Sequence, residues 1–132
     1  MRSDKTFDFI TSIYAFPHFI LKDLERSAKK IHSMLNSGGK FILVLADEKY
    51  LKNKLAADSD LLIEKKYITF RGKKYEQVLH FADIPKIGRV MDYDREEKFY
   101  IDLFTENKFK LKLRKNINDN EFISTTFIFE KV

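Results

Sequence analysis

Side chains that could contact a ligand gather at the end of the first strand-like segment of the chain. Residues 7–14 are rich in aromatic and β-branched residues and are apolar on both faces at their centre. This pattern is typical of a buried parallel strand. Because open α/β sheets bind ligands beyond the carboxyl ends of their strands, we expect Ser12, Ile13 and Tyr14 to line a crevice.

His18 follows this segment and is a candidate general base, since imidazoles often transfer protons near neutral pH. A histidine in such a loop also caps or packs locally, and we favour that structural interpretation. His18, His32 and His80 show no metal-ligand spacing. The chain has no cysteine, which excludes disulfides, thiolate metal sites and cysteine nucleophiles, and which fits a cytoplasmic location.

The elements that must position these residues begin with a βαβ unit. Apolar residues recur at helical spacing over residues 21–35, and Asn36–Gly39 provides a turn that ends the helix. Residues 41–46 are all apolar, which predicts a central strand covered on both faces. A strand, a helix and a second strand in this order predict parallel pairing with a right-handed crossover.

The remaining pattern predicts a single α/β domain over residues 1–132, with further strands and helices after the βαβ unit. We expect a short helix over 47–57, a β-hairpin built from 67–70 and 75–81, a loop or irregular strand over 83–92, a helix over 94–106, and a final antiparallel hairpin of 109–113 and 122–129. The inserted hairpin occupies about residues 64–92.

Four short segments carry a recognisable order of motifs. They are Phe-Asp-Phe-Ile at 7–10, Tyr-Ala-Phe-Pro-His-Phe at 14–19, Met-Leu-Asn-Ser-Gly-Gly-Lys-Phe at 34–41, and Asn-Lys-Phe-Lys-Leu at 107–111. The ordered set resembles the C-terminal half of the class I S-adenosylmethionine-dependent methyltransferase domain. Lys108 stands where that family usually has glycine.

The resemblance implies a partial Rossmann-like methyltransferase fold, with a mixed sheet, two parallel strands, a C-terminal antiparallel hairpin and an inserted β-hairpin. It implies that Ser12, Ile13 and Tyr14 lie near the methionyl part of S-adenosylmethionine, and that Phe16, His18 and Phe19 lie closer to an unknown methyl acceptor. Tyr14 and Phe16 fit equally well as packed aromatic residues. We also expect Asp47, at the end of the next strand, to face the crevice.

The family's cofactor-binding Gly-x-Gly turn has no counterpart among the four glycines of this chain. The resemblance therefore implies that the half of the domain holding most of the cofactor is missing, so that this chain alone is inactive. The strand at 7–14 would then have an unpaired apolar edge. We expect a homodimer or a complex with a separate N-terminal half through this edge. The alternative function is a non-catalytic interaction module that oligomerises there.

The charge pattern argues against nucleic acid as a partner. The net charge is +5, but most of the 25 basic residues alternate with the 20 acidic ones. The densest basic stretch, residues 65–74, is better explained as a solvated surface than as an RNA-binding patch. No run of about 18 apolar residues predicts a membrane span.

Overall fold

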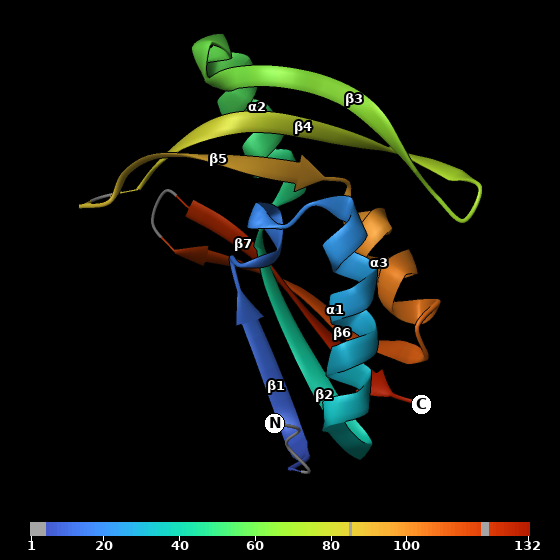
Figure 1. The fold of residues 1–132 in the computed structure, drawn as a ribbon. Helices are drawn as coiled ribbons and strands as arrows, with labels where there is room; N and C mark the ends of the chain where they lie inside the picture. Colours follow the sequence, from blue (N-terminus) through green and yellow to red (C-terminus); the bar gives the residue numbers. More distant parts are fainter. Residues whose placement is uncertain (1–4, 85, 120–121) are drawn as a thin grey trace.

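The computed structural model describes residues 5–84, 86–119 and 122–132. Its larger sheet has the strand order β1-β2-β7-β6 (Figure 1). These strands are β1 (Phe7–Ile13), β2 (Leu35–Ala46), β6 (Phe109–Asp119) and β7 (Phe122–Lys131). β1 and β2 are parallel, whereas β7 runs antiparallel to β2 and β6. The predicted mixed sheet with one parallel pair and a C-terminal antiparallel hairpin is confirmed.

Helix α1 (Leu21–Met34) joins β1 to β2 and completes the predicted βαβ unit. The predicted glycine turn is part of β2, where it forms a bulge in the pairing with β1. Gly38 has a φ of +74°, and a Cβ at Gly39 would lie 2.8 Å from the carbonyl oxygen of Asn36. Only glycine fits these two positions without strain.

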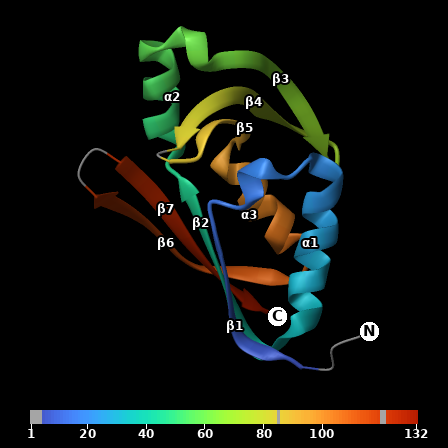
Figure 2. The same ribbon diagram turned by 60° about the vertical axis from the view of Figure 1, so that its left-hand side comes forward.

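The core lies between the four-stranded sheet and two helices that cover the same face, α1 and α3 (Glu97–Thr105) (Figures 1 and 2). Phe104 of α3 is fully buried, and its ring centroid lies 4.9 Å from those of Phe41 and Phe129. Such contacts add to the free energy of burying the rings. The buried phenylalanines of this core are Phe16, Phe41, Phe70, Phe99, Phe104, Phe109, Phe127 and Phe129.

A second sheet, here called the inserted sheet, separates β2 from α3 in the sequence. It follows helix α2 (Glu48–Ala57) and consists of β3 (Leu62–Phe70), β4 (Lys73–Ile84) and β5 (Gly88–Arg95) in that order. Arg71 and Gly72 have φ angles of 49° and 82°, which suits the tight turn of the β3–β4 hairpin. Figures 1 and 2 show the inserted sheet across the carboxyl ends of β1 and β2.

The third strand of the inserted sheet differs from the sequence-based expectation of a loop or irregular strand over 83–92. Strand β5 pairs with β4 from Gln77–Arg95 to Ile84–Gly88. It also takes up Asp94 and Arg95, which the pattern assigned to the following helix. The polar composition of β5 hid this strand, because it pairs with β4 in a hairpin without an apolar alternation of its own.

Strand β1 is the edge of the four-stranded sheet, as predicted. The side chains of Phe9 and Ile13 are 63% and 62% exposed. The apolar strand was expected to be buried on both faces, but these side chains project from the face that α1 and α3 leave open. No helix in the described ranges is long and apolar enough to cross a membrane.

Candidate functional site

A cavity of about 610 Å³ lies where the carboxyl ends of β1 and β2 meet the inserted sheet. Tyr14, Leu45 and Ala46 line it from the four-stranded sheet, and Phe81 and Asp94 line it from β4 and β5. Open α/β sheets bind ligands at this edge, and the volume is in the usual range for small-molecule sites. We take this cavity as the candidate functional site.

His18 lines the cavity from the short 3-10 helix η1 (Phe16–His18) that follows β1. Its Nδ1 lies 2.8 Å from Oδ1 of Asp92 on β5, and the Asp92 side chain is only 19% exposed. A carboxylate at Nδ1 is the arrangement that orients an imidazole for proton transfer at Nε2. The sequence indicated His18 but not its partner, because only the folding of β5 brings the two together.

Tyr14 also lines the cavity, with its ring edge-on to Phe122 at a centroid distance of 5.7 Å. Its backbone is left-handed, with a φ of 56°, and its N–H donates to the carbonyl of Val44 at 3.0 Å. A non-glycine residue in this conformation costs about 1–2 kcal/mol and is often found at functional sites. Tyr14 therefore has both a cavity position and a packed ring, as the two sequence interpretations suggested.

Ser12 and Ile13, the other predicted cofactor contacts, do not line the cavity although both are described. The hydroxyl of Ser12 is buried and has no hydrogen-bond partner among the described residues. A buried hydroxyl without a hydrogen-bond partner is uncommon in folded proteins. The side chain of Ile13 points outward and is 62% exposed. The cofactor role of these residues stays a prediction.

Phe16 and Phe19 pack below the cavity rather than in its wall. Phe16 is buried in the core, 5.8 Å from Phe104 between ring centroids, and Phe19 packs against the same core. The carbonyl of Phe19 accepts a hydrogen bond of 2.6 Å from Arg95. These contacts fix the loop that carries His18. The structure does not bring either ring to the cavity with His18, and their predicted contact with an acceptor stays untested.

Asp94 is a cavity residue that the sequence analysis missed. Burial raises the pKa of its carboxyl to about 7, and the nearby carboxylate of Glu48 acts in the same direction. No hydrogen bond or ion pair to the Asp94 side chain is present among the described residues. A carboxyl group that titrates near neutral pH in a cavity is a functional candidate. No sequence signal could have identified it without the position of β5.

Arg95 also borders the cavity but is held by the protein itself. Its guanidinium donates to Gln77 Oε1 at 2.7 Å, to Tyr100 Oη at 3.1 Å and to the Phe19 carbonyl. It also lies over the Tyr93 ring, 5.0 Å from the centroid. Buried and satisfied in this way, Arg95 ties the inserted sheet to α3 and to the loop after β1.

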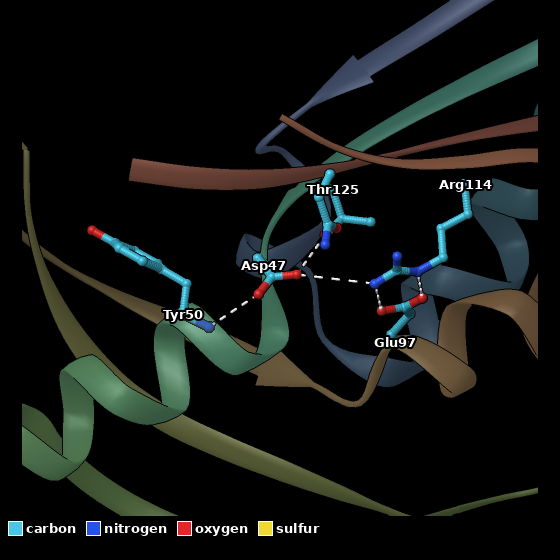
Figure 3. A network of polar contacts seen from close by, with 6 residues as sticks. Asp47, Tyr50, Glu97, Arg114 and Thr125 are labelled. Atoms are coloured by element: carbon cyan, nitrogen blue, oxygen red, sulfur yellow. Dashed lines mark hydrogen bonds and ion pairs between the residues drawn. The ribbon is translucent and has the colours of Figure 1, made fainter. Parts of the chain in front are cut away.

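Asp47, predicted to face the crevice, is engaged in structural contacts instead (Figure 3). Its carboxylate accepts from the backbone N–H of Tyr50 at 3.1 Å, which caps α2, and from the hydroxyl of Thr125 at 2.9 Å. Arg114 lies 4.0 Å away and forms a two-pronged ion pair with Glu97. Asp47 therefore fixes α2 against β7 and is absent from the cavity wall. In the described ranges no cluster of His, Asp or Glu could hold a metal ion.

Comparison with known proteins supports the resemblance. Residues 2–43 match the family model described as a methyltransferase domain. No curated protein matches the sequence. Among solved structures, a protein from Pyrococcus horikoshii OT3 covers 98% of this chain at 19% identity with a TM-score of 0.61. A SAM-dependent methyltransferase from Methanosarcina mazei covers 98% at 18% identity, with a TM-score of 0.64.

The glycopeptide N-methyltransferase MtfA, solved with S-adenosylmethionine, covers the whole chain at 14% identity with a TM-score of 0.67. The chain spans 53%, 61% and 60% of the lengths of these three structures. The chain thus resembles S-adenosylmethionine-dependent methyltransferases in its Rossmann-like fold, and residues 2–43 resemble a methyltransferase domain in sequence.

Proposed function

We propose that this chain provides the acceptor-binding side of an S-adenosylmethionine-dependent methyltransferase. The observation that carries the proposal is the position of the cavity. It opens at the carboxyl ends of the parallel strands, under the inserted sheet, in a fold like that of known methyltransferases. His18, Asp92 and Asp94 give it groups that can bind and deprotonate a nucleophile.

Ser12, Ile13 and Tyr14 would hold the methionyl end of the cofactor, and the unsatisfied hydroxyl of Ser12 fits that role. When bound, S-adenosylmethionine supplies an electrophilic methyl group, whose bond to sulfur breaks as the acceptor bonds to its carbon. The chain's own residues orient the acceptor and remove its proton. His18 is suited to this because its Nδ1 lies 2.8 Å from the Asp92 carboxylate, where a small rotation of the ring would make the hydrogen bond that orients it. The methyl acceptor itself and a cytoplasmic location stay predictions.

The chain alone should bind the cofactor weakly and be inactive, because its sequence contains no Gly-x-Gly turn. Titration of the ¹⁵N-labelled chain with S-adenosylhomocysteine, followed by NMR, tests the cofactor assignment. We expect millimolar binding with the largest shifts around Ser12 and Tyr14. Ser12→Ala should weaken binding, whereas Ser33→Ala, which removes an exposed hydroxyl on α1, should not. No shift at the end of β1 would overturn the assignment.

A second candidate function is an interaction module that assembles through β1. β1 is an edge strand with neither proline nor lysine within it, and its Phe9 and Ile13 side chains are exposed on the open face of the sheet. Such an edge pairs readily with another strand. The partner would be a second copy of the chain or a separate N-terminal half.

Light scattering tests the homodimer. The interaction hypothesis predicts dimers that Phe9→Lys dissociates, with Leu113→Lys as a control on the opposite edge strand, where Leu113 is 47% exposed. A wild-type monomer would reject the homodimer. It would leave only a separate chain, detectable by binding of that chain to the wild type and not to Phe9→Lys.

A further inference from the structure

The cavity wall has the opposite charge balance to the chain as a whole. The chain carries a net charge of +5, but the residues that line the cavity include only two lysines or arginines, Lys54 and Arg95. The acidic residues in the wall are Glu48, Asp58, Asp83, Asp92, Asp94 and Glu97. Because Arg95 is already bonded to three protein groups, it offers little positive charge to a ligand.

Several of these carboxylates are paired with cationic side chains of the protein, so only some of them are left to attract a charged ligand. Asp83 pairs with Arg89 at 2.9 Å, Glu97 pairs with Arg114, and Glu48 lies 3.6 Å from Lys52. Asp92 lies against His18, so its charge is only partly balanced. Asp58 and Asp94 have no hydrogen bond or ion pair to their side chains in the described part of the chain, but Asp58 is exposed whereas Asp94 is half-buried. Asp92 and ionised Asp94 therefore contribute most of the negative field inside the cavity.

Aromatic rings form part of the cavity wall. Tyr14 and Phe122 lie edge-on to each other, and each is more than a third exposed. Phe81 and Tyr93 already have the guanidinium groups of Arg89 and Arg95 over their rings. Aromatic faces combined with carboxylates form a favourable environment for an organic ammonium group and an unfavourable one for an anion.

Resting on the function proposed above, we infer that the methyl acceptor is an amine, bound as an ammonium group beside Asp92 and Asp94 with its apolar part against the Tyr14 and Phe122 rings. The amine must lose a proton before its nitrogen can accept a methyl group. The N–H bond breaks with its electron pair left on nitrogen, and the proton passes to His18 or to the Asp94 carboxylate. A carboxylic acid acceptor would instead meet two like charges in this wall.

Binding of three probes with the same phenyl group tests the inference without the cofactor: phenethylamine, 2-phenylethanol and 3-phenylpropionate, each titrated into the ¹⁵N-labelled chain. We expect phenethylamine to bind at the cavity at least about fivefold more tightly than the alcohol, and the carboxylate to bind most weakly. Asp94→Asn should reduce this preference, because Asp92 keeps one carboxylate beside the ammonium group. Asp23→Asn, which removes one negative charge from exposed α1, should preserve it.

The pH dependence gives a second readout. Affinity for phenethylamine should rise between about pH 6 and about pH 8 as Asp94 ionises, since the probe stays protonated over this range. The charged groups around Asp94 are Glu48 and Lys52 on α2, Glu76 on β4 and Arg95 on β5. The other titratable groups on this side of the cavity are His18, Asp92, His80 on β4 and Tyr100 on α3. In Asp94→Asn the rise should become smaller.

The outcomes separate the inference from the proposed function. Equal binding of amine and alcohol, no binding of any probe, or a preference unchanged in Asp94→Asn would overturn the amine inference. If S-adenosylhomocysteine still perturbs Ser12 and Tyr14 in that case, the proposed function stands with another acceptor class. If the amine binds as expected and S-adenosylhomocysteine causes no change, the amine site stands and the methyltransferase proposal fails.

Discussion

His18 Nδ1 and Asp92 Oδ1 lie 2.8 Å apart and join the loop after β1 to the inserted sheet. The double-mutant cycle His18→Gln, Asp92→Asn should give a coupling energy of about 0.5–1.5 kcal/mol in the free energy of unfolding. The imidazole ¹⁵N shifts should show Nδ1 as the protonated nitrogen in the neutral form. A coupling near zero would mean that Asp92 does not orient His18, which would weaken the general-base proposal.

Asp94→Asn should stabilise the chain at alkaline pH, because the folded-state pKa of Asp94 is raised to about 7 from 3.8. The folded state binds this proton more tightly than the unfolded state. The resulting stability is fully present below about pH 4 and is lost as the pH rises through about 7. At about pH 8 the variant should be more stable by about 2 kcal/mol, allowing for partial exposure of the side chain.

Urea unfolding at about pH 5 and about pH 8 measures this difference. At the lower pH the difference should shrink to less than half its value at about pH 8, because at about pH 5 the carboxyl is protonated in the folded chain but already ionised in the unfolded chain. A variant that is destabilised equally at both values would show that the Asp94 carboxyl makes a stabilising contact, and that burial is not its main cost.

Asp47→Ala should destabilise the fold by about 1.5–2 kcal/mol, mainly because it removes the helix cap of α2. The buried Thr125 hydroxyl loses its carboxylate acceptor but can still donate to Oδ1 of Asn116 at 3.0 Å. Asp47→Asn should cost less, about 1 kcal/mol, since asparagine also caps helices. Thermal unfolding of both variants checks the order. If Asp47→Asn and Asp47→Ala lower the free energy of unfolding equally, the negative charge that faces Arg114 contributes more than the helix cap.

The sequence predicted elements wherever a local pattern determined them. The spacing of Leu24 and Ala28 marked α1, and the apolar run of β2 marked a central strand. The ligand edge followed from the βαβ order, and Tyr14 and His18 line the cavity there, whereas Ser12 and Ile13 do not. The elements and the ligand edge could be predicted because they depend on periodicity and topology.

The rest of the site depends on contacts between distant segments. Strand β5 exists because it pairs with β4, and its polar sequence does not alternate like a half-buried strand. Asp92 and Asp94 could therefore not be placed in a cavity from their sequence context. Asp47 ended β2 as predicted, but the cap of α2 and the hydroxyl of Thr125 take its carboxylate. The position of a residue along a strand therefore does not predict which group its side chain will contact.

Lys108→Gly should stabilise the protein. Lys108 has a φ of 66°, in the left-handed region that costs non-glycine residues about 1–2 kcal/mol, and the resembling family usually has glycine here. Relief of this strain, less the greater entropy of glycine in the unfolded chain, leaves about 0.5–1 kcal/mol. Lys110→Gly, in the extended backbone of β6, is the matched control and should destabilise by about 0.5–1 kcal/mol. Chemical unfolding of both variants measures the two changes in the free energy of unfolding. Stabilisation by Lys108→Gly alone would show that the positive φ of Lys108 is strained. Destabilisation by both variants would mean that the Lys108 side chain contributes more stability than its backbone conformation costs.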